Sequence, residues 1–268
     1  MNDDNGKQSF WEHLDVLRSV IIRIAIVTIL FGLVAFIFKD EVFSIILAPK
    51  DSDFTTYRII DLLGGKISGN TSGYFSVQLI NTGLAEQFII HVKTAICVGV
   101  LCASPYIIYQ LFRFVSPALY ANETKYAIRV VAGGYIMFLL GVLLTYYMVF
   151  PLTFRFLATY HVSDDVSNMI SLNSYISTLS VMSLSMGIVF EIPVLSWLFA
   201  KMGLISASFM RCYRKHAIVI ILIIAAIITP TSDVFTLLLV ALPMIILYEF
   251  SIFIIKTNEN VDAGLRKI

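Results

Sequence analysis

V-F-E-I-P-V-L, residues 189–195, places a glutamate and a proline inside a segment that otherwise suits the hydrocarbon core of a membrane. The chain is uncharged from 166 to 190, meets Glu191, and is uncharged again from 192 to 200. At 1.5 Å per residue this is too long for one straight crossing and too short for two with a polar turn. Because a proline ring removes a backbone donor, we predict one membrane helix over 171–200, bent near Pro193.

The composition around this segment is that of a membrane protein. Of the 268 residues, 58% are apolar or aromatic and 14% are charged, against roughly 25% charged in soluble domains. The formal net charge of +1 gives no basic field for nucleic acid. The three cysteines and four histidines form no metal-binding motif, so neither a metal site nor a cofactor is expected.

Six membrane crossings are predicted in one domain, 1–268, and all of them are helices. A crossing needs about 20 apolar residues, and the last two segments fall short or barely reach this length. The T-P-T-S-D turn at 229–233 separates them, and Ser232 or Asp233 can cap the helix that follows. The third segment is expected to stop at Pro151. The spans are placed at 19–38, 94–112, 130–150, 171–200, 216–229 and 234–255.

An even number of crossings places both ends of the chain on one side. That side, with the connections 113–129 and 201–215, holds 13 of the 19 Lys and Arg residues. Basic residues concentrate on the cytoplasmic side, so both termini are predicted to be cytoplasmic. The connection 39–93 then faces outward; its centre is predicted to be loop, and 81–91 could form a short interfacial helix.

Glu191 is the candidate for chemistry within the membrane. It lies ten residues before Lys201, about 15 Å from the cytoplasmic end of its helix. An ionised carboxylate at that depth costs at least about 2.5 kcal/mol, so the side chain is either protonated or faces a polar cavity or partner. One reading is a neutral carboxyl bonded to serines within the bundle. The other is a functional acid in a concavity, where serines 180, 183 and 185 supply hydroxyls along the preceding turns. The sequence leaves its protonation state open.

Other acids gather at the predicted cytoplasmic surface. Glu123 sits at a helix entrance, where capping is an alternative role. Glu12 and Asp15 precede the first crossing, where they could simply be solvated. Carboxylates on two such elements could also receive guanidinium groups bidentately, which suits a peptide that carries arginines.

Four motifs in this order resemble the TatC subunit of the twin-arginine protein translocase. They are F-W-E-H-L-D-V-L-R at 10–18, S-P-Y-I-I-Y-Q-L-F-R-F-V-S-P-A-L-Y-A-N-E-T-K at 104–125, F-E-I-P-V at 190–194, and the stretch from T-P-T-S-D to Y-E at 229–249. The resemblance covers nearly the whole chain and is weakest in 39–93. It implies a receptor in the cell inner membrane, not an enzyme. Such a receptor binds twin-arginine signal peptides of folded proteins at the cytoplasmic face.

The resemblance also implies partners and residue roles. TatC proteins recruit single-span TatA/TatB-type subunits for transport driven by the proton gradient, and self-association is expected. The matching signal-peptide positions are Glu123, Phe114, Pro117 and Arg18. Glu191 matches an intramembrane glutamate that meets partner helices, and Pro49 and Asp233 match outer-side positions.

The segment before the first crossing departs from the family at one position. The family reads H-L-x-E-L-R, whereas residues 13–18 are H-L-D-V-L-R, which puts Val16 in place of the glutamate. Our hypothesis is that Asp15 or Glu12 supplies the missing acid. Asp15 lies about 100° around the helix from position 16 and is shorter, so the geometry must differ.

Three other classes of protein compete with this reading. A proton-coupled small-solute transporter would use Glu191 as a relay, but it calls for a second buried charge. The sequence lacks the motifs expected of an intramembrane hydrolase, because no His or Asp pair falls at membrane depth and no G-x-S-x-G is present. A purely structural scaffold is the third.

Overall fold

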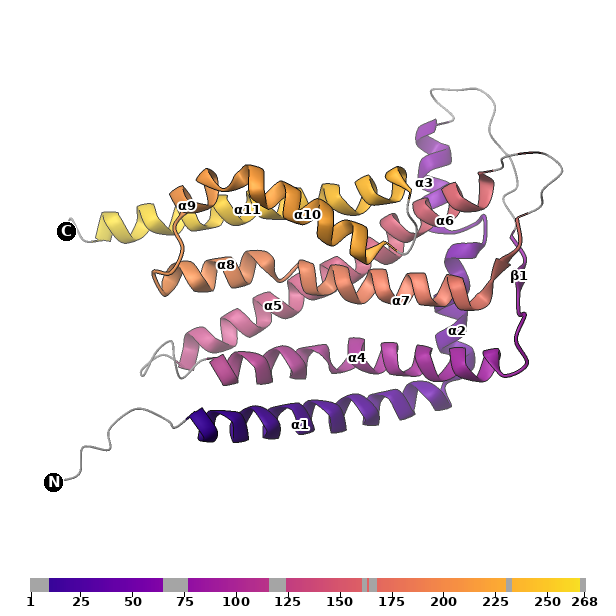
Figure 1. Ribbon diagram of the computed structural model, residues 1–268, viewed down its shortest axis with the longest axis horizontal. Helices are drawn as coiled ribbons and strands as arrows, with labels where there is room; N and C mark the ends of the chain where they lie inside the picture. The colour runs from indigo at the N-terminus through magenta and orange to yellow at the C-terminus, as the bar shows by residue number, and fades with distance from the viewer. Residues whose placement is uncertain are drawn as a thin grey trace.

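The computed structural model describes residues 10–64, 77–115, 124–160, 163, 168–229 and 233–265, and these are almost entirely helical (Figure 1). The elements are, in chain order, α1 (Phe10–Ile37), α2 (Lys39–Leu47), the 3₁₀ turn η1 (Ala48–Lys50), α3 (Thr55–Gly64), β1 (Leu79–Ile80), α4 (Glu86–Val115), α5 (Thr124–Leu144), the π-helical turn η3 (Thr145–Val149), α6 (Phe150–Thr159), β2 (Ile170–Ser171), α7 (Leu172–Val189), α8 (Ile192–Lys201), α9 (Ala207–Cys212), α10 (Arg214–Ile228) and α11 (Val234–Leu265).

Five helical segments in the described residues are long and apolar enough to cross a membrane. They measure 24 to 30 residues and are Leu14–Ile37, Glu86–Phe114, Val130–Thr159, Leu172–Lys201 and Val234–Thr257. The predicted span 216–229 corresponds to α10, which has 15 residues and is about 22 Å long. Because α10 is shorter than the hydrocarbon core, the count of six crossings stays a prediction.

The long helices run side by side, and α5 crosses them obliquely (Figure 1). Helix α1 packs along α4, which in turn contacts α5 and α7; α11 packs against α8 and α10. The start of α1 and the end of α11 lie at one end of the bundle, while α2, α3, α6 and β1 lie at the opposite end (Figure 1).

Glycines allow two of these helix pairs to approach closely. A Cβ at Gly99 of α4 would lie 2.7 Å from the Thr28 carbonyl oxygen of α1. A Cβ at Gly141 of α5 would lie 2.6 Å from the Met186 carbonyl oxygen of α7. Both obstacles are backbone atoms, so only a residue without a side chain fits at these crossings.

The buried core lies where η3, α6, α7 and α11 meet. Phe150 and Tyr175 pack edge-to-face with their ring centroids 5.0 Å apart. Met182, Met186 and Met244 belong to the same buried cluster and are fully buried. Methionine side chains are flexible, so they fill the irregular space between obliquely crossing helices.

The third span does not end at Pro151, which corrects the expectation from sequence. The helix passes through η3, where the Phe150 N–H bonds to the Thr145 carbonyl, and continues as α6 to Thr159. Pro151 falls in the first turn of α6. Proline cannot donate to the carbonyl one turn earlier, so the α-helical bonding is interrupted at Pro151, and the π-helical turn η3 lies directly before it.

The connection 39–93 contains more helix than expected. Helices α2 and α3 and turn η1 occupy much of 39–64, and β1 pairs in parallel with β2, with Leu79 opposite Ile170. The predicted short helix at 81–91 is the beginning of α4, which is helical without interruption from Glu86. The glycine- and serine-rich centre of the connection, 65–76, lies outside the described residues.

Candidate functional site

Glu191 lies at a break between two helices of the fourth span. Helix α7 ends at Val189 and α8 begins at Ile192, with Pro193 in its first turn. Because the ring of Pro193 carries no N–H, it cannot bond to the carbonyl one turn earlier. The Glu191 carbonyl accepts from the Leu195 N–H at 2.9 Å, which starts α8. The bend that the sequence predicts near Pro193 is therefore present.

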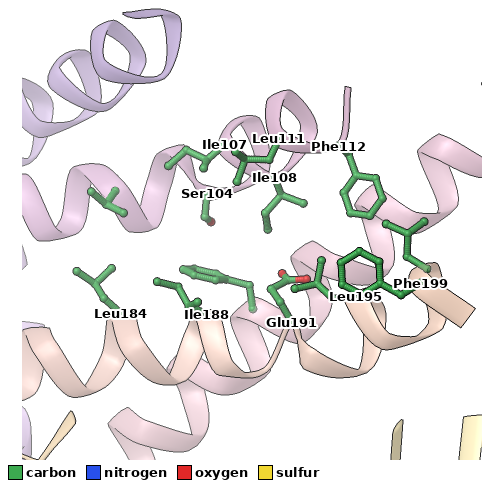
Figure 2. A pocket seen from close by; sticks show the side chains of 13 residues that line it. Ser104, Ile107, Ile108, Leu111, Phe112, Leu184, Ile188, Glu191, Leu195 and Phe199 are labelled. Atoms are coloured by element: carbon green, nitrogen blue, oxygen red, sulfur yellow. The ribbon is translucent and has the colours of Figure 1, made fainter. Parts of the chain in front are cut away.

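The Glu191 carboxyl points into an apolar cavity between α4 and the α7–α8 pair (Figure 2). The cavity has a volume of about 470 Å³, and Phe138 of α5 also lines it. Glu191 is the one charged residue in its lining, and Ser104 is the one residue with a hydroxyl. The lining residues are Val100, Ser104, Ile107, Ile108, Leu111, Phe112, Phe138, Leu184, Ile188, Glu191, Leu195, Leu198 and Phe199.

The carboxyl group has an open hydrogen-bonding position. Glu191 Oε1 is buried and has no hydrogen-bond partner within the described part of the chain. In particular, Oε1 is not bonded to the serines at 180, 183 and 185, which the sequence offered as partners. A buried polar atom without a partner is costly, so a donor that enters the cavity would be bound favourably here.

The predicted signal-peptide residues that the structure describes lie at the end of the bundle where α1 begins. Asp15, Val16 and Arg18 are exposed on the first turns of α1. Phe114 is half-buried near the end of α4, which lies beside the start of α1 (Figure 1). Glu12 belongs to α1, but its side chain is outside the described set.

Glu123 and Pro117 both lie outside the described residues. Among the described residues, Asp15, Arg18 and Phe114 thus come to one end of the α1–α4 pair.

Pro49 is buried in η1 at the opposite end. The Tyr57 hydroxyl of α3 lies 2.9 Å from the Pro49 carbonyl oxygen and 3.1 Å from that of Pro151. The Arg155 guanidinium lies over the Tyr57 ring, 5.6 Å from its centroid. Burial raises the pKa of the Tyr57 phenol well above its usual value, so the hydroxyl remains a donor. Pro49 thus belongs to a fixed junction between η1, α3 and α6.

Asp233 begins α11 as an N-cap. Its Oδ1 accepts a hydrogen bond from the Thr236 N–H at 2.6 Å, and the side chain is half-buried. This agrees with the capping role that the T-P-T-S-D turn indicates, because the first N–H groups of a helix lack partners within it.

Sequence reasoning missed several residues of these sites. Gly134 of α5 faces the Glu191 carboxyl, and Ser104 of α4 lines the same cavity. The glycine pair 133–134 inside an apolar span was a signal for a close approach. Tyr57 could not have been found, because its contact with Pro151 joins positions 94 residues apart.

A third missed contact joins the two last helices. Arg214 of α10 donates a hydrogen bond of 2.6 Å to Glu249 of α11.

No group of three or more His, Cys, Asp or Glu side chains in the described residues could hold a metal ion.

Comparison with known proteins gives one consistent family. The sequence model of the family described as Sec-independent protein translocase protein (TatC) matches residues 12–243. The TatC of Blattabacterium from Periplaneta americana is 36% identical over 260 residues, which cover 95% of this chain and 97% of that protein. The TatC of Aquifex aeolicus is 35% identical, with 96% and 98% covered.

A solved structure agrees with these relatives. It is a crystal structure of the twin-arginine translocase receptor TatC, which is 34% identical to this chain and superposes with a TM-score of 0.73. The match covers 92% of this chain and 99% of that one. The long apolar helices, the bent fourth span and these relatives lead to one conclusion: this chain belongs to the TatC family of Sec-independent protein translocase proteins.

Proposed function

We propose that this chain is the receptor subunit of a twin-arginine translocase. It lies in the cell inner membrane with both termini in the cytoplasm and binds the signal peptides of folded proteins there. It also recruits single-span TatA/TatB-type subunits for export driven by the proton gradient. The observation that carries the proposal is the 34% identity to a solved twin-arginine translocase receptor across 92% of this chain.

The signal-peptide site is assigned to the end where α1 begins. Asp15 and Arg18 are exposed on α1, and Phe114 lies near the end of the neighbouring α4. Glu123 follows eight residues after the end of α4. An arginine pair has two guanidinium groups, and each can bond bidentately to one carboxylate. Asp15 or Glu12 supplies the second acid, because Val16 occupies the position where the family has glutamate.

The partner-helix site is assigned to the cavity that contains Glu191. Its walls are apolar apart from Glu191 and Ser104, as the side of a single-span helix requires. A donor side chain on that helix would satisfy Glu191 Oε1. Self-association of the chain would leave this cavity available if it uses other faces, such as the exposed apolar side of α1.

Capture of a signal peptide tests the proposed function directly. The detergent-purified chain should bind a peptide with an arginine pair and should bind the version with two lysines at least about tenfold more weakly, because lysine cannot form bidentate bonds. Equal capture of both peptides contradicts the proposal. Solute flux into liposomes that contain only this chain would instead favour the proton-coupled transporter.

Charge reversals identify the acids that receive the arginines. Glu123→Lys and Asp15→Lys should each weaken peptide binding about tenfold or more, since each removes a charge-assisted bond and adds a repulsive charge. Asp53→Lys is the matched control, because Asp53 is exposed and lies just before α3, which is at the opposite end of the bundle (Figure 1). Unchanged binding and export in Asp15→Lys would reject Asp15, and Glu12→Lys would then be examined.

Photocrosslinking tests the partner site. A photoreactive residue at Ile188 lines the cavity, is 66% exposed and leaves Glu191 intact. It should capture a single-span subunit, whereas the same residue at Ile26, which is exposed on α1, should capture much less. Equal capture at the two positions contradicts this assignment.

A further inference from the structure

Gly134 of α5 lies directly opposite the Glu191 carboxyl. A Cβ at position 134 would lie 2.9 Å from Glu191 Oε2 and 3.4 Å from Oε1. It would also lie 3.3 Å from Ile108 Cγ2 of α4, on the other side of the same space. Gly134 is buried, so the carboxyl occupies the volume that a side chain at 134 would take.

The neighbouring Gly133 shows that the close approach to the Glu191 carboxyl belongs to one face of α5. A Cβ at Gly133 would meet nothing within 4 Å. Gly133 lies instead at a second apolar cavity of about 340 Å³, which Pro193, Trp197 and Phe250 also line. Both positions are in the middle of a helix, where alanine is intrinsically favoured over glycine. The two positions therefore differ in their surroundings but not in their intrinsic helix propensity.

We propose that Gly134 is a positioning residue for Glu191. Its bare Cα forms a seat in which the carboxyl rests against α5, so the side chain does not extend across the cavity toward α4. The cavity thereby stays open for a partner side chain, and Oε1 is kept buried beside it without a hydrogen-bond partner among the described residues. The seating itself is a property of the isolated chain; its consequence for export rests on the proposed role of Glu191 as the partner-helix contact.

Chemical labelling of the isolated chain measures the seating. Dicyclohexylcarbodiimide adds to carboxyl groups in apolar surroundings, and mass spectrometry gives its rate at Glu191. In Gly134→Ala the carboxyl is pushed toward the cavity, and the labelling rate should rise about fivefold, as expected for a side chain forced from its preferred rotamer. In Gly133→Ala it should stay within about twofold of the unaltered chain. An unchanged rate in Gly134→Ala, or an equal rise in both variants, overturns the proposal.

A double-substitution cycle separates positioning from packing. Glu191→Asp shortens the side chain by about 1.5 Å and withdraws the carboxyl from position 134. Gly134→Ala should reduce capture of the single-span partner from Ile188 about fivefold with Glu191 present, and less than about twofold in the Glu191→Asp background. Equal losses in the two backgrounds would mean that Gly134 acts independently of Glu191, which contradicts the proposal.

The two measurements distinguish this inference from the proposed function. If the labelling rate responds to Gly134→Ala but Ile188 captures no partner in any variant, the seat exists and the partner assignment fails. If Ile188 captures the partner and Gly134→Ala changes neither the capture nor the labelling rate, the receptor assignment holds and the seat is rejected.

Discussion

At the scale of single residues, two half-buried carboxylates are used in different ways. Asp233 Oδ1 accepts a 2.6 Å hydrogen bond from the Thr236 N–H and so serves the fold. Glu191 Oε1 has no such bond within the described residues and faces a cavity. An apolar chain keeps a buried acid at a cost, and the apolar cavity that Glu191 lines is the reason to propose it for recognition.

Removal of the Asp233 cap should destabilise α11. Asp233→Ala leaves the Thr236 N–H without its acceptor and should lower the free energy of unfolding by about 1 kcal/mol. Thermal unfolding in detergent measures the change as a lower Tm. Asn caps helices about as well as Asp, so Asp233→Asn should retain the Tm.

The same pair of variants tests whether the Asp233 charge has a role of its own. If Asp233→Asn keeps the Tm but loses export, the charge acts beyond the cap. A Tm of Asp233→Ala equal to that of the unaltered chain would show that the cap contributes nothing to stability.

At the scale of elements, α1 depends mainly on its contact with α4. Only 17% of its most apolar window is buried within the chain, and many of its apolar side chains are exposed. In a membrane those side chains face lipid or another protein, and they provide little attraction toward α4. Close backbone packing at Gly99 therefore has a large part in holding α1 in place.

A single methyl group at this crossing should separate the two helices. In Gly99→Ala the new Cβ would lie 2.7 Å from the Thr28 carbonyl oxygen and 2.8 Å from the Gly32 nitrogen. Backbone atoms cannot move aside as a side chain would, so the free energy of unfolding should fall by about 1–3 kcal/mol despite the higher helix propensity of alanine.

Gly133→Ala controls for helix propensity, because it adds the same methyl group to open space. It should leave the Tm in detergent unchanged or raise it slightly. A Tm for Gly99→Ala at or above that of Gly133→Ala would show that the α1–α4 crossing tolerates a side chain.

At the scale of the whole molecule, the bundle has two distinct ends. One holds the start of α1 and the end of α11 (Figure 1). The other is tied together by hydrogen bonds between distant segments, such as Tyr175 to the Ile46 carbonyl at 3.0 Å and Tyr146 to the Ile45 carbonyl at 2.6 Å. Distant segments also meet at the first end, where Arg214 of α10 bonds to Glu249 of α11 at 2.6 Å. In the proposed orientation, the end that holds α2 and α3 is the outer one.

The proposed orientation predicts which end faces the cytoplasm. Cysteines introduced at the exposed positions Asp53, Asp15 and Lys256 would be tested singly after replacement of the free cysteines Cys97, Cys102 and Cys212. A membrane-impermeant maleimide applied from outside should label Asp53→Cys at once, and should label the other two only after the membrane is opened. Labelling of position 15 from one side and position 256 from the other contradicts a shared side for the two ends.

Much of the fold could be predicted from local patterns. Apolar segments located the long helices to within a few residues at several ends, and Pro193 located the bend. The extension of the third span past Pro151 was missed, because a π-helical turn depends on how neighbouring helices pack. The helices at 39–64 were missed because their sequence is mixed in polarity. One of them, α3, is also held by Tyr57, which bonds to the carbonyl of Pro151, 94 residues away.

The sequence by itself determined that the chain lives in a membrane, that its fourth span bends, and that an acid lies at that bend. These follow from hydropathy and from the missing N–H of proline, which are properties of neighbouring residues. Only the tertiary structure decided that Glu191 faces a cavity against Gly134, and that Pro49 joins Tyr57 and Pro151 in one junction. The contacts of Glu191 with Gly134 and of Tyr57 with Pro151 join residues that are far apart along the chain, so helix packing decides which of them meet.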